Sequence, residues 1–182
     1  MAEKPYKFGI LIGRFQVLHA GHEMMIEKGL ALCEKVGILV GSSQESGTAK
    51  NPFSYEMRKK MLHTVFGDQI EVYPLPDAGL GNNSKWGEYV LKHVVDRFGR
   101  LPDLLISGKE SRRVDWFDGI ADVSELYIPK TIDISASRMR EAFLADDVAF
   151  FRQFSNPKLW ECYDEMKKAV LAAKDHTETD SI

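Results

Sequence analysis

Short apolar runs alternate with stretches of helical periodicity along most of this chain, and this alternation limits the possible folds. The runs are typical of buried strands and cover residues 7–12, 36–40, 70–73, 104–106 and 126–128. Helices are expected over residues 20–33, from a cap at Ser54 to residue 66, and over 86–98, 136–144, 148–154 and 158–173. Strands that alternate with helices form a mainly parallel sheet. The sequence therefore predicts an α/β fold, a Rossmann-like doubly wound sheet with helices on both faces and a helical C-terminal segment.

One domain is expected over residues 1–173. The chain has 182 residues, of which 44% are hydrophobic and 28% charged, as is usual for a single globular domain. Residues 174–182 are polar and lack periodicity, so we expect a disordered tail. Cys33 and Cys162 both fall in expected helices, far apart in the sequence. We interpret them as free thiols in a reducing compartment, the cytoplasm.

Charge and hydropathy each disfavour one class of partner. The formal net charge is −3 and no dense run of Lys or Arg occurs, whereas a nucleic-acid-binding protein needs a basic surface. No apolar run approaches the roughly 20 residues that cross a bilayer. We therefore expect neither nucleic acid nor membrane as a partner, while a mononucleotide ligand remains possible.

The segment from Gly13 to His22, GRFQVLHAGH, joins the first expected strand to the first expected helix. A helix start presents unpaired N–H groups and the positive end of the helix dipole, which together bind anions. Arg14, His19 and His22 add polar side chains there, and Gly21 allows a phosphate to approach the backbone. The segment predicts a phosphate site at the carboxyl end of a strand, where such sheets bind their ligands.

Two other interpretations of the histidines are less favoured. One histidine could cap the helix while the other packs on the sheet, but this suits a lone histidine better than a pair beside Arg14. A zinc site lacks a third ligand at suitable spacing, so no resident metal is predicted.

A second polar helix start follows residue 134. Ser135 or Ser137 can cap the helix that begins near Ala136, which leaves hydroxyl and N–H groups available to a phosphate. Arg140 can then fold back over that phosphate. Capping serines alone indicate only a helix start, and the pairing with the histidine segment makes this motif specific.

These motifs resemble the nucleotidyltransferase superfamily with the HxGH signature, and within it the archaeal-type nicotinamide mononucleotide adenylyltransferases. The resemblance spans residues 13–140 in family order. Besides the first segment it includes Gly41–Ser46, Asn51-Pro52-Phe53, Arg58, Asn83-Ser84-Lys85-Trp86, Ser107-Gly108 and Ile134–Arg140.

The resemblance implies a role for each matching residue. His19, His22 and Arg140 would be catalytic. ATP and its phosphates would contact Gly13, Arg14, Gly21, Lys50, Ser135 and Ser137. Nicotinamide mononucleotide (NMN) would contact Gly41, Ser42, Asn83 and Trp86. The substrates would be ATP with Mg²⁺ and NMN, the products NAD and pyrophosphate, and the protein a homo-oligomer. Trp116 and Trp160 are interpreted as packing residues.

The chemistry agrees with this inventory of histidines, arginines and glycines. The second pKa of a phosphate monoester is about 6, so the nucleophile is already largely ionised at neutral pH and needs no general base. The remaining tasks are to align two anions and to stabilise the transferring phosphates, which cations and N–H groups can perform.

Two alternatives concern the acceptor and the activity. The stretch 76–83 and Lys109 depart from the family near the inferred acceptor pocket. Nicotinate mononucleotide, phosphopantetheine or a cytidylyl transfer therefore remain possible. A nucleotide sensor without catalysis is the other alternative, although the intact set of histidines and arginines favours an enzyme. Neither GxGxxG nor GxxxxGK[ST] occurs, which disfavours a dehydrogenase or a Walker-type ATPase.

Overall fold

The computed structural model describes residues 2–81, 84–108 and 115–179. Its strands are β1 (Tyr6–Gly13), β2 (Cys33–Gly41), β3 (Ile70–Leu75), β4 (Leu104–Ser107) and β5 (Ser124–Tyr127). Its α-helices are α1 (Ala20–Leu32), α2 (Tyr55–Phe66), α3 (Ser84–Phe98), α4 (Ala136–Leu144), α5 (Val148–Phe154) and α6 (Tyr163–Thr179). Two short 3₁₀ helices are η1 (Gly67–Gln69) and η2 (Pro157–Cys162).

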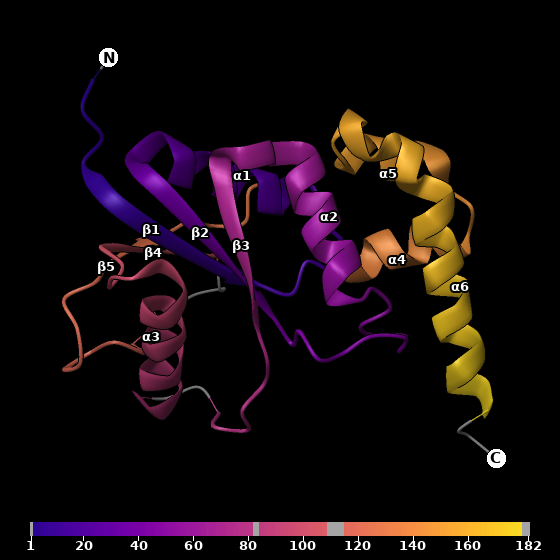
Figure 1. Cartoon of the computed structure of the whole chain (residues 1–182). Coiled ribbons are helices and arrows are strands. Elements are labelled where there is room, and N and C mark those ends of the chain that lie inside the picture. The colour runs from indigo at the N-terminus through magenta and orange to yellow at the C-terminus, as the bar shows by residue number, and fades with distance from the viewer. Residues whose placement is uncertain (1, 82–83, 109–114, 180–182) are drawn as a thin grey trace.

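The strands form one parallel sheet in the order β3-β2-β1-β4-β5. Helices α1 and α2 lie on one side of the sheet, and α3 lies on the other (Figure 1). The chain reverses its direction of travel across the sheet between β1 and β4, which are neighbours although α1, α2 and α3 separate them in sequence. The predicted fold class is confirmed, and the carboxyl ends of β1 and β4 are where such a sheet binds ligands.

Alternation along the strands divides the apolar core between the two faces. Leu11 of β1 belongs to the cluster that packs with α1 and α2, whereas Phe8 and Ile10 belong to the cluster that packs with α3. Successive side chains of a strand point to opposite faces, so one apolar run supplies both clusters. This explains why the strands appear as continuous apolar runs in the sequence.

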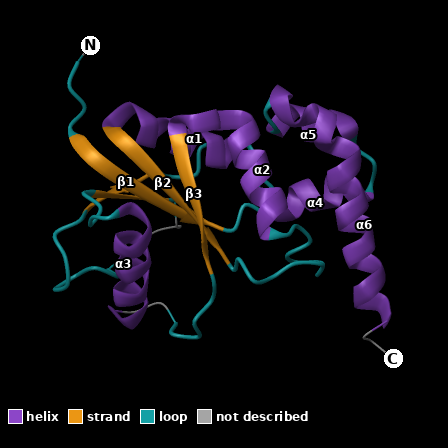
Figure 2. Cartoon of the chain, in the orientation of Figure 1, coloured by secondary structure: helices purple, strands orange, loops and turns teal. Residues whose placement is uncertain are grey.

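The C-terminal helices form a unit beside α2. Helix α4 packs against α5 and α6, and η2 packs against α2 (Figure 2). The expected helices at 136–144 and 148–154 match α4 and α5. The last expected helix, 158–173, instead begins as the 3₁₀ helix η2, and α6 continues to Thr179. The helical backbone thus extends into the segment that the sequence assigns to a tail.

One strand boundary also differs from the prediction. Cys33 is expected in a helix but is the first residue of β2, and its N–H still donates to the Gly29 carbonyl of α1. The sequence has no turn residue between the last residues of α1 and Cys33, so the apolar pattern gives no sign of the change.

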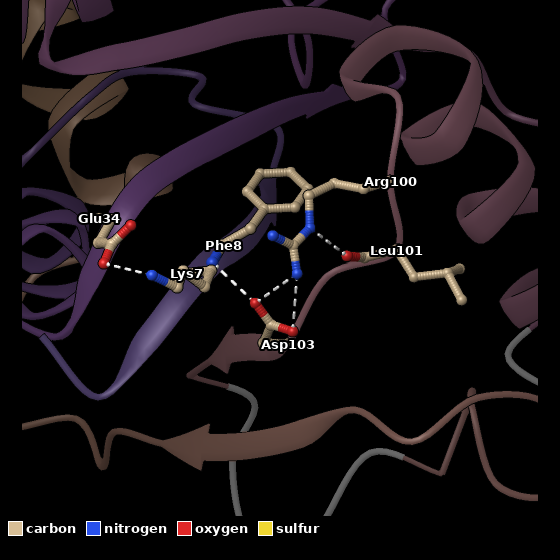
Figure 3. A network of polar contacts seen from close by, with 6 residues as sticks. All are labelled: Lys7, Phe8, Glu34, Arg100, Leu101 and Asp103. Atoms are coloured by element: carbon tan, nitrogen blue, oxygen red, sulfur yellow. Dashed lines mark hydrogen bonds and ion pairs between the residues drawn. The ribbon is translucent and has the colours of Figure 1, made fainter.

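Polar contacts hold the amino-terminal ends of the strands, opposite the ligand-binding edge (Figure 3). The Asp103 carboxylate accepts a hydrogen bond of 2.9 Å from the Phe8 N–H and pairs with Arg100. Lys7 pairs with Glu34 at 3.1 Å. The first contact ties the segment before β4 to β1, the second ties β1 to β2, and both lie away from the edge where ligands bind.

Within the described part of the chain, no helix has both the length and the apolar character that a membrane span requires.

Candidate active site

Two cavities lie at the carboxyl edge of the sheet. The larger, of about 550 Å³, is lined by Ile12, Gly13, Arg14, Gly41, Ser42, Asp77, Ala78, Gly79, Leu80, Gly81, Trp86 and Trp116. The smaller, of about 200 Å³, is lined by His19, Gly21, His22, Met24, Met25, Gly108, Ile128, Pro129, Lys130, Thr131, Ile132 and Ile134. The segment from Gly13 to His22 contributes its first residues to the larger cavity and its last residues to the smaller. One loop and helix start therefore serves both cavities.

The two histidines form a reciprocal cap at the start of α1. The Gly21 N–H donates to His19 Nδ1 at 3.1 Å, and the His19 N–H donates to His22 Nδ1 at 3.4 Å. Because each Nδ1 accepts a backbone N–H, the ring proton must be on Nε2 in both residues. The capping role, first considered as an alternative, thus occurs together with the position on a cavity. It leaves the Nε2–H group of each ring as a hydrogen-bond donor, and the His22 ring also forms a hydrogen bond with the backbone of Val17.

Both histidines are uncharged at neutral pH. Burial lowers the pKa of His19 to about 4, and the charge of Lys130 acts in the same direction. Burial also lowers the pKa of His22 well below its ordinary value, and His19 adds to this effect. Neutral imidazoles can donate a hydrogen bond to a phosphate oxygen without a change in their own protonation.

Arg140 reaches from α4 to the loop after β1. Its Nη1 donates to the Gln16 carbonyl at 2.7 Å, and its Nη2 donates to Ser137 Oγ at 3.3 Å. Ser135 caps α4, since its hydroxyl accepts the Arg138 N–H at 3.2 Å. The two signature segments, more than 100 residues apart in the sequence, are therefore joined directly.

Three arginines carry positive charge to this edge of the sheet. Burial lowers the pKa of Arg58 to about 10, and the charge of Arg14 contributes. Burial likewise lowers the pKa of Arg140, again with a contribution from Arg14. Arg14 itself lines the larger cavity. Positive charges placed this close repel one another, and an anion bound among them relieves this repulsion.

Two tryptophans form one wall of the larger cavity. The indole rings of Trp86 and Trp116 meet edge to face, with centroids 6.1 Å apart. Gly87 permits this arrangement, because a Cβ on that residue would collide with the Trp116 backbone carbonyl. Trp116 packs in the core as expected, yet it also borders the cavity, which the sequence does not reveal.

Among the described residues that line the larger cavity, Asp77 is the one acidic residue. Its carboxylate accepts hydrogen bonds from Ser42 Oγ at 3.1 Å and from Gln44 Nε2 at 2.9 Å. The Asp77 N–H donates to Gln44 Oε1 at 3.0 Å. These contacts connect the loop after β3 to the loop after β2. No pattern in the sequence distinguishes Asp77 from other loop carboxylates.

The structure brings most of the predicted site residues together. Those that line one of the two cavities are Gly13, Arg14, His19, Gly21, His22, Gly41, Ser42 and Trp86. Gly13 and Arg14, predicted to contact ATP, border the same cavity as the residues predicted to contact NMN. Lys50 is exposed and does not line either cavity. Asn83 and Lys109 lie outside the described residues.

No group of three or more His, Cys, Asp or Glu side chains among the described residues is arranged to hold a metal ion. The donors at this edge are imidazole, guanidinium and backbone N–H groups, which suit phosphate oxygens.

Comparison with known proteins agrees with this geometry. Residues 10–142 match the family described as cytidylyltransferase-like. The nicotinamide-nucleotide adenylyltransferase of Saccharolobus solfataricus is 39% identical over 88 residues, which are 45% of this chain and 50% of that protein. The nicotinamide/nicotinic acid mononucleotide adenylyltransferase of Acinetobacter baylyi is 38% identical over 93 residues, which are 49% of this chain and 50% of that protein. The chain thus matches about half the length of these relatives.

A solved structure supports the fold over a longer stretch. The bifunctional NMN adenylyltransferase/ADP ribose pyrophosphatase of Francisella tularensis, complexed with AMP and Mn ion, superposes with a TM-score of 0.74 at 23% identity. The match covers 94% of this chain and 53% of that one.

Proposed function

Because the chain belongs to the cytidylyltransferase-like family, we propose that it transfers the adenylyl group of ATP to nicotinamide mononucleotide, with NAD and pyrophosphate as products. The observation that carries this proposal is that the segment from Gly13 to His22 lines two cavities, the larger with its first residues and the smaller with its last. A reaction between two nucleotides needs two adjoining pockets with phosphate-binding groups between them. The choice of acceptor follows the relatives, which are nicotinamide-nucleotide adenylyltransferases.

The acceptor occupies the larger cavity in this proposal. The phosphate of NMN lies toward Gly13 and Arg14, and its nicotinamide ring lies against Trp86 and Trp116. The ring of NMN is a pyridinium cation, and indole faces attract such cations. The Asp77 carboxylate adds attraction for the same charge.

The nucleoside of ATP occupies the smaller cavity. Its walls are mostly apolar and include Met24, Met25 and Ile132, which suit the flat face of a purine. His19 and His22, which line this cavity, belong to the segment whose first residues line the larger cavity. The triphosphate then extends toward the arginines.

The transfer needs one bond formed and one broken. An oxygen of the acceptor phosphate attacks the α-phosphorus of ATP, and the bond from that phosphorus to the bridging oxygen breaks, so its electron pair leaves with pyrophosphate. The Nε2–H groups of His19 and His22 donate to the α-phosphate and leaving oxygens, and Arg14 and Arg140 balance the developing charge. Mg²⁺ enters as part of the MgATP substrate, where it neutralises phosphate charge.

Several further assignments stay predictions. Lys50 and Asn83 are predicted to contact ATP and NMN, respectively, and the predicted phosphate contacts of Ser135 and Ser137 now compete with their bonds inside the protein. A homo-oligomer in the cytoplasm is likewise a prediction.

Pyrophosphate release from MgATP tests the proposal, with NMN, nicotinate mononucleotide and phosphopantetheine offered separately. We expect release with NMN, and Trp86→Ala should raise the KM for NMN about tenfold because a ring contact of about 1.4 kcal/mol is lost. Release with none of the three would favour the sensor. An unchanged KM in Trp86→Ala would remove NMN from the larger cavity.

A further inference from the structure

Arg58 is a buried cation that the proposed reaction does not use. Its side chain is fully buried, and no described carboxylate forms an ion pair with it. Burying a charge without a counter-ion is costly unless hydrogen bonds compensate for the lost water. An arginine in such a place therefore needs a structural or functional reason.

All the hydrogen bonds of Arg58 go to backbone carbonyls. Its Nη1 donates to Arg14 at 3.0 Å and to Gly41 at 2.9 Å, and its Nη2 donates to Ser42 at 3.1 Å and to Glu45 at 3.3 Å. Its Nε donates to Ser54 at 3.3 Å. The five donor hydrogens of the guanidinium thus bind the loop after β1, the loop after β2 and the start of α2 together.

Three of the five residues whose carbonyls Arg58 binds also line the larger cavity. They are Arg14, Gly41 and Ser42. Ser42 has a φ of 45° and Phe15, which follows Arg14, a φ of 52°. Such left-handed backbone is unfavourable at a residue other than glycine and persists only where surrounding contacts impose it. The bonds from Arg58 to the Arg14 and Ser42 carbonyls are contacts of this kind.

We propose that Arg58 is a positioning residue for the phosphate of the acceptor. It holds the loops after β1 and β2 in the conformation that forms the phosphate end of the larger cavity. Its positive charge also lies close to Arg14 and adds to the attraction for an anion there. The identity of the acceptor rests on the proposed function, whereas the action of Arg58 on an anion in this cavity does not.

Three variants separate positioning from simple stability. Arg58→Met removes the charge and every side-chain hydrogen bond, and Arg58→Lys keeps the charge with at most three donors. Met61→Ala is the matched control, because Met61 is also buried on α2 but belongs to the apolar core. We expect Arg58→Met to raise the KM for NMN at least tenfold, with less than a threefold change in the KM for ATP, and Arg58→Lys to restore part of this loss. Met61→Ala should lower the Tm and leave both KM values unchanged.

Titration with inorganic phosphate, followed by thermal shift, tests the inference independently of turnover. The apparent Kd for phosphate should rise at least fivefold in Arg58→Met and stay unchanged in Met61→Ala. An equal rise of both KM values, or an unchanged Kd for phosphate in Arg58→Met, would overturn the positioning role. If the wild-type chain uses no acceptor but the Kd shift occurs, the proposed function fails and the inference about Arg58 stands.

Discussion

The imidazole rings of His19 and His22 stack with their centroids 3.9 Å apart and their planes inclined by 22°. Two charged imidazoles would repel each other at this distance, so the stack agrees with the low pKa of both residues. The stack and the reciprocal cap fix the directions of the two Nε2–H groups before any ligand binds. Donors that are held in this way need little reorganisation during reaction.

Removing either imidazole should therefore reduce turnover more than stability. We expect His22→Ala and His19→Ala to lower kcat by about 10²–10³, in line with the loss of one preorganised donor to a developing charge. His63→Ala, at the far end of α2, is the matched histidine control and should retain wild-type turnover. Steady-state pyrophosphate release measures all three. A kcat within threefold of wild type in His22→Ala would contradict the role of its Nε2–H group.

The same histidines make stability depend on pH. The pKa of His19 is about 4 in the folded protein against 6.5 when unfolded, so below pH 6.5 the unfolded chain binds protons that the folded chain excludes. The contribution of His19 to the free energy of unfolding is therefore fully present above pH 6.5 and is lost as the pH falls toward 4. Melting temperatures at pH 7.5, 6 and 5 should decline less steeply in His19→Asn, which keeps a capping side chain but does not titrate. Parallel declines in the two proteins would refute this account.

The features that the sequence predicts are local ones. Ser54 and Ser135 cap α2 and α4 as expected, since a cap depends on a few neighbouring residues. The histidine segment is likewise found from its position between a strand and a helix. The roles of Arg58, Asp77 and Trp116 depend on which loops the sheet order brings together, and periodicity contains no such information. In the sequence Gly87 is only a glycine within an amphipathic helix, and the need for glycine there follows from its contact with the Trp116 backbone.

Asp77 should influence the choice between amide and acid forms of the acceptor. The nicotinamide ring of NMN is cationic, whereas nicotinate adds a carboxylate that the Asp77 charge disfavours. Both acceptors carry the same phosphate, so the repulsion between that phosphate and Asp77 cancels from the ratio of their kcat/KM values. We expect Asp77→Asn to shift the ratio of kcat/KM values toward nicotinate mononucleotide by about three- to tenfold, or roughly 0.7–1.4 kcal/mol. The exposure of Asp77 limits the effect.

The control for this comparison is Gln44→Ala, which removes a hydrogen-bond partner of Asp77 and leaves its charge. Competition assays with both acceptors give the ratio directly. If Asp77→Asn and Gln44→Ala lower use of both acceptors equally, Asp77 only ties the two loops together.

Gly87→Ala should damage the acceptor cavity through the backbone. A Cβ at this position would force the Trp116 segment away from α3 and separate the two indoles. We expect a lower Tm, by several degrees, and a KM for NMN raised at least as much as in Trp86→Ala, with the KM for ATP little changed. Gly67→Ala offers a contrast, because the left-handed φ of Gly67 strains an alanine at a position remote from the cavities. A Gly87→Ala protein with wild-type acceptor KM would show that the cavity wall tolerates the shift.

The walls of the two cavities come from different parts of the chain, and this separates two kinds of evolutionary change. Apart from Trp116, the described residues that line the larger cavity lie between Ile12 and Trp86, whereas those of the smaller are Gly108, a stretch between Ile128 and Ile134, and residues at the start of α1. Substitutions in residues 77–86 can therefore create a preference for a new acceptor while the donor pocket and the reacting segment remain intact. Proteins with this arrangement of cavities can come to form different products by the same transfer reaction.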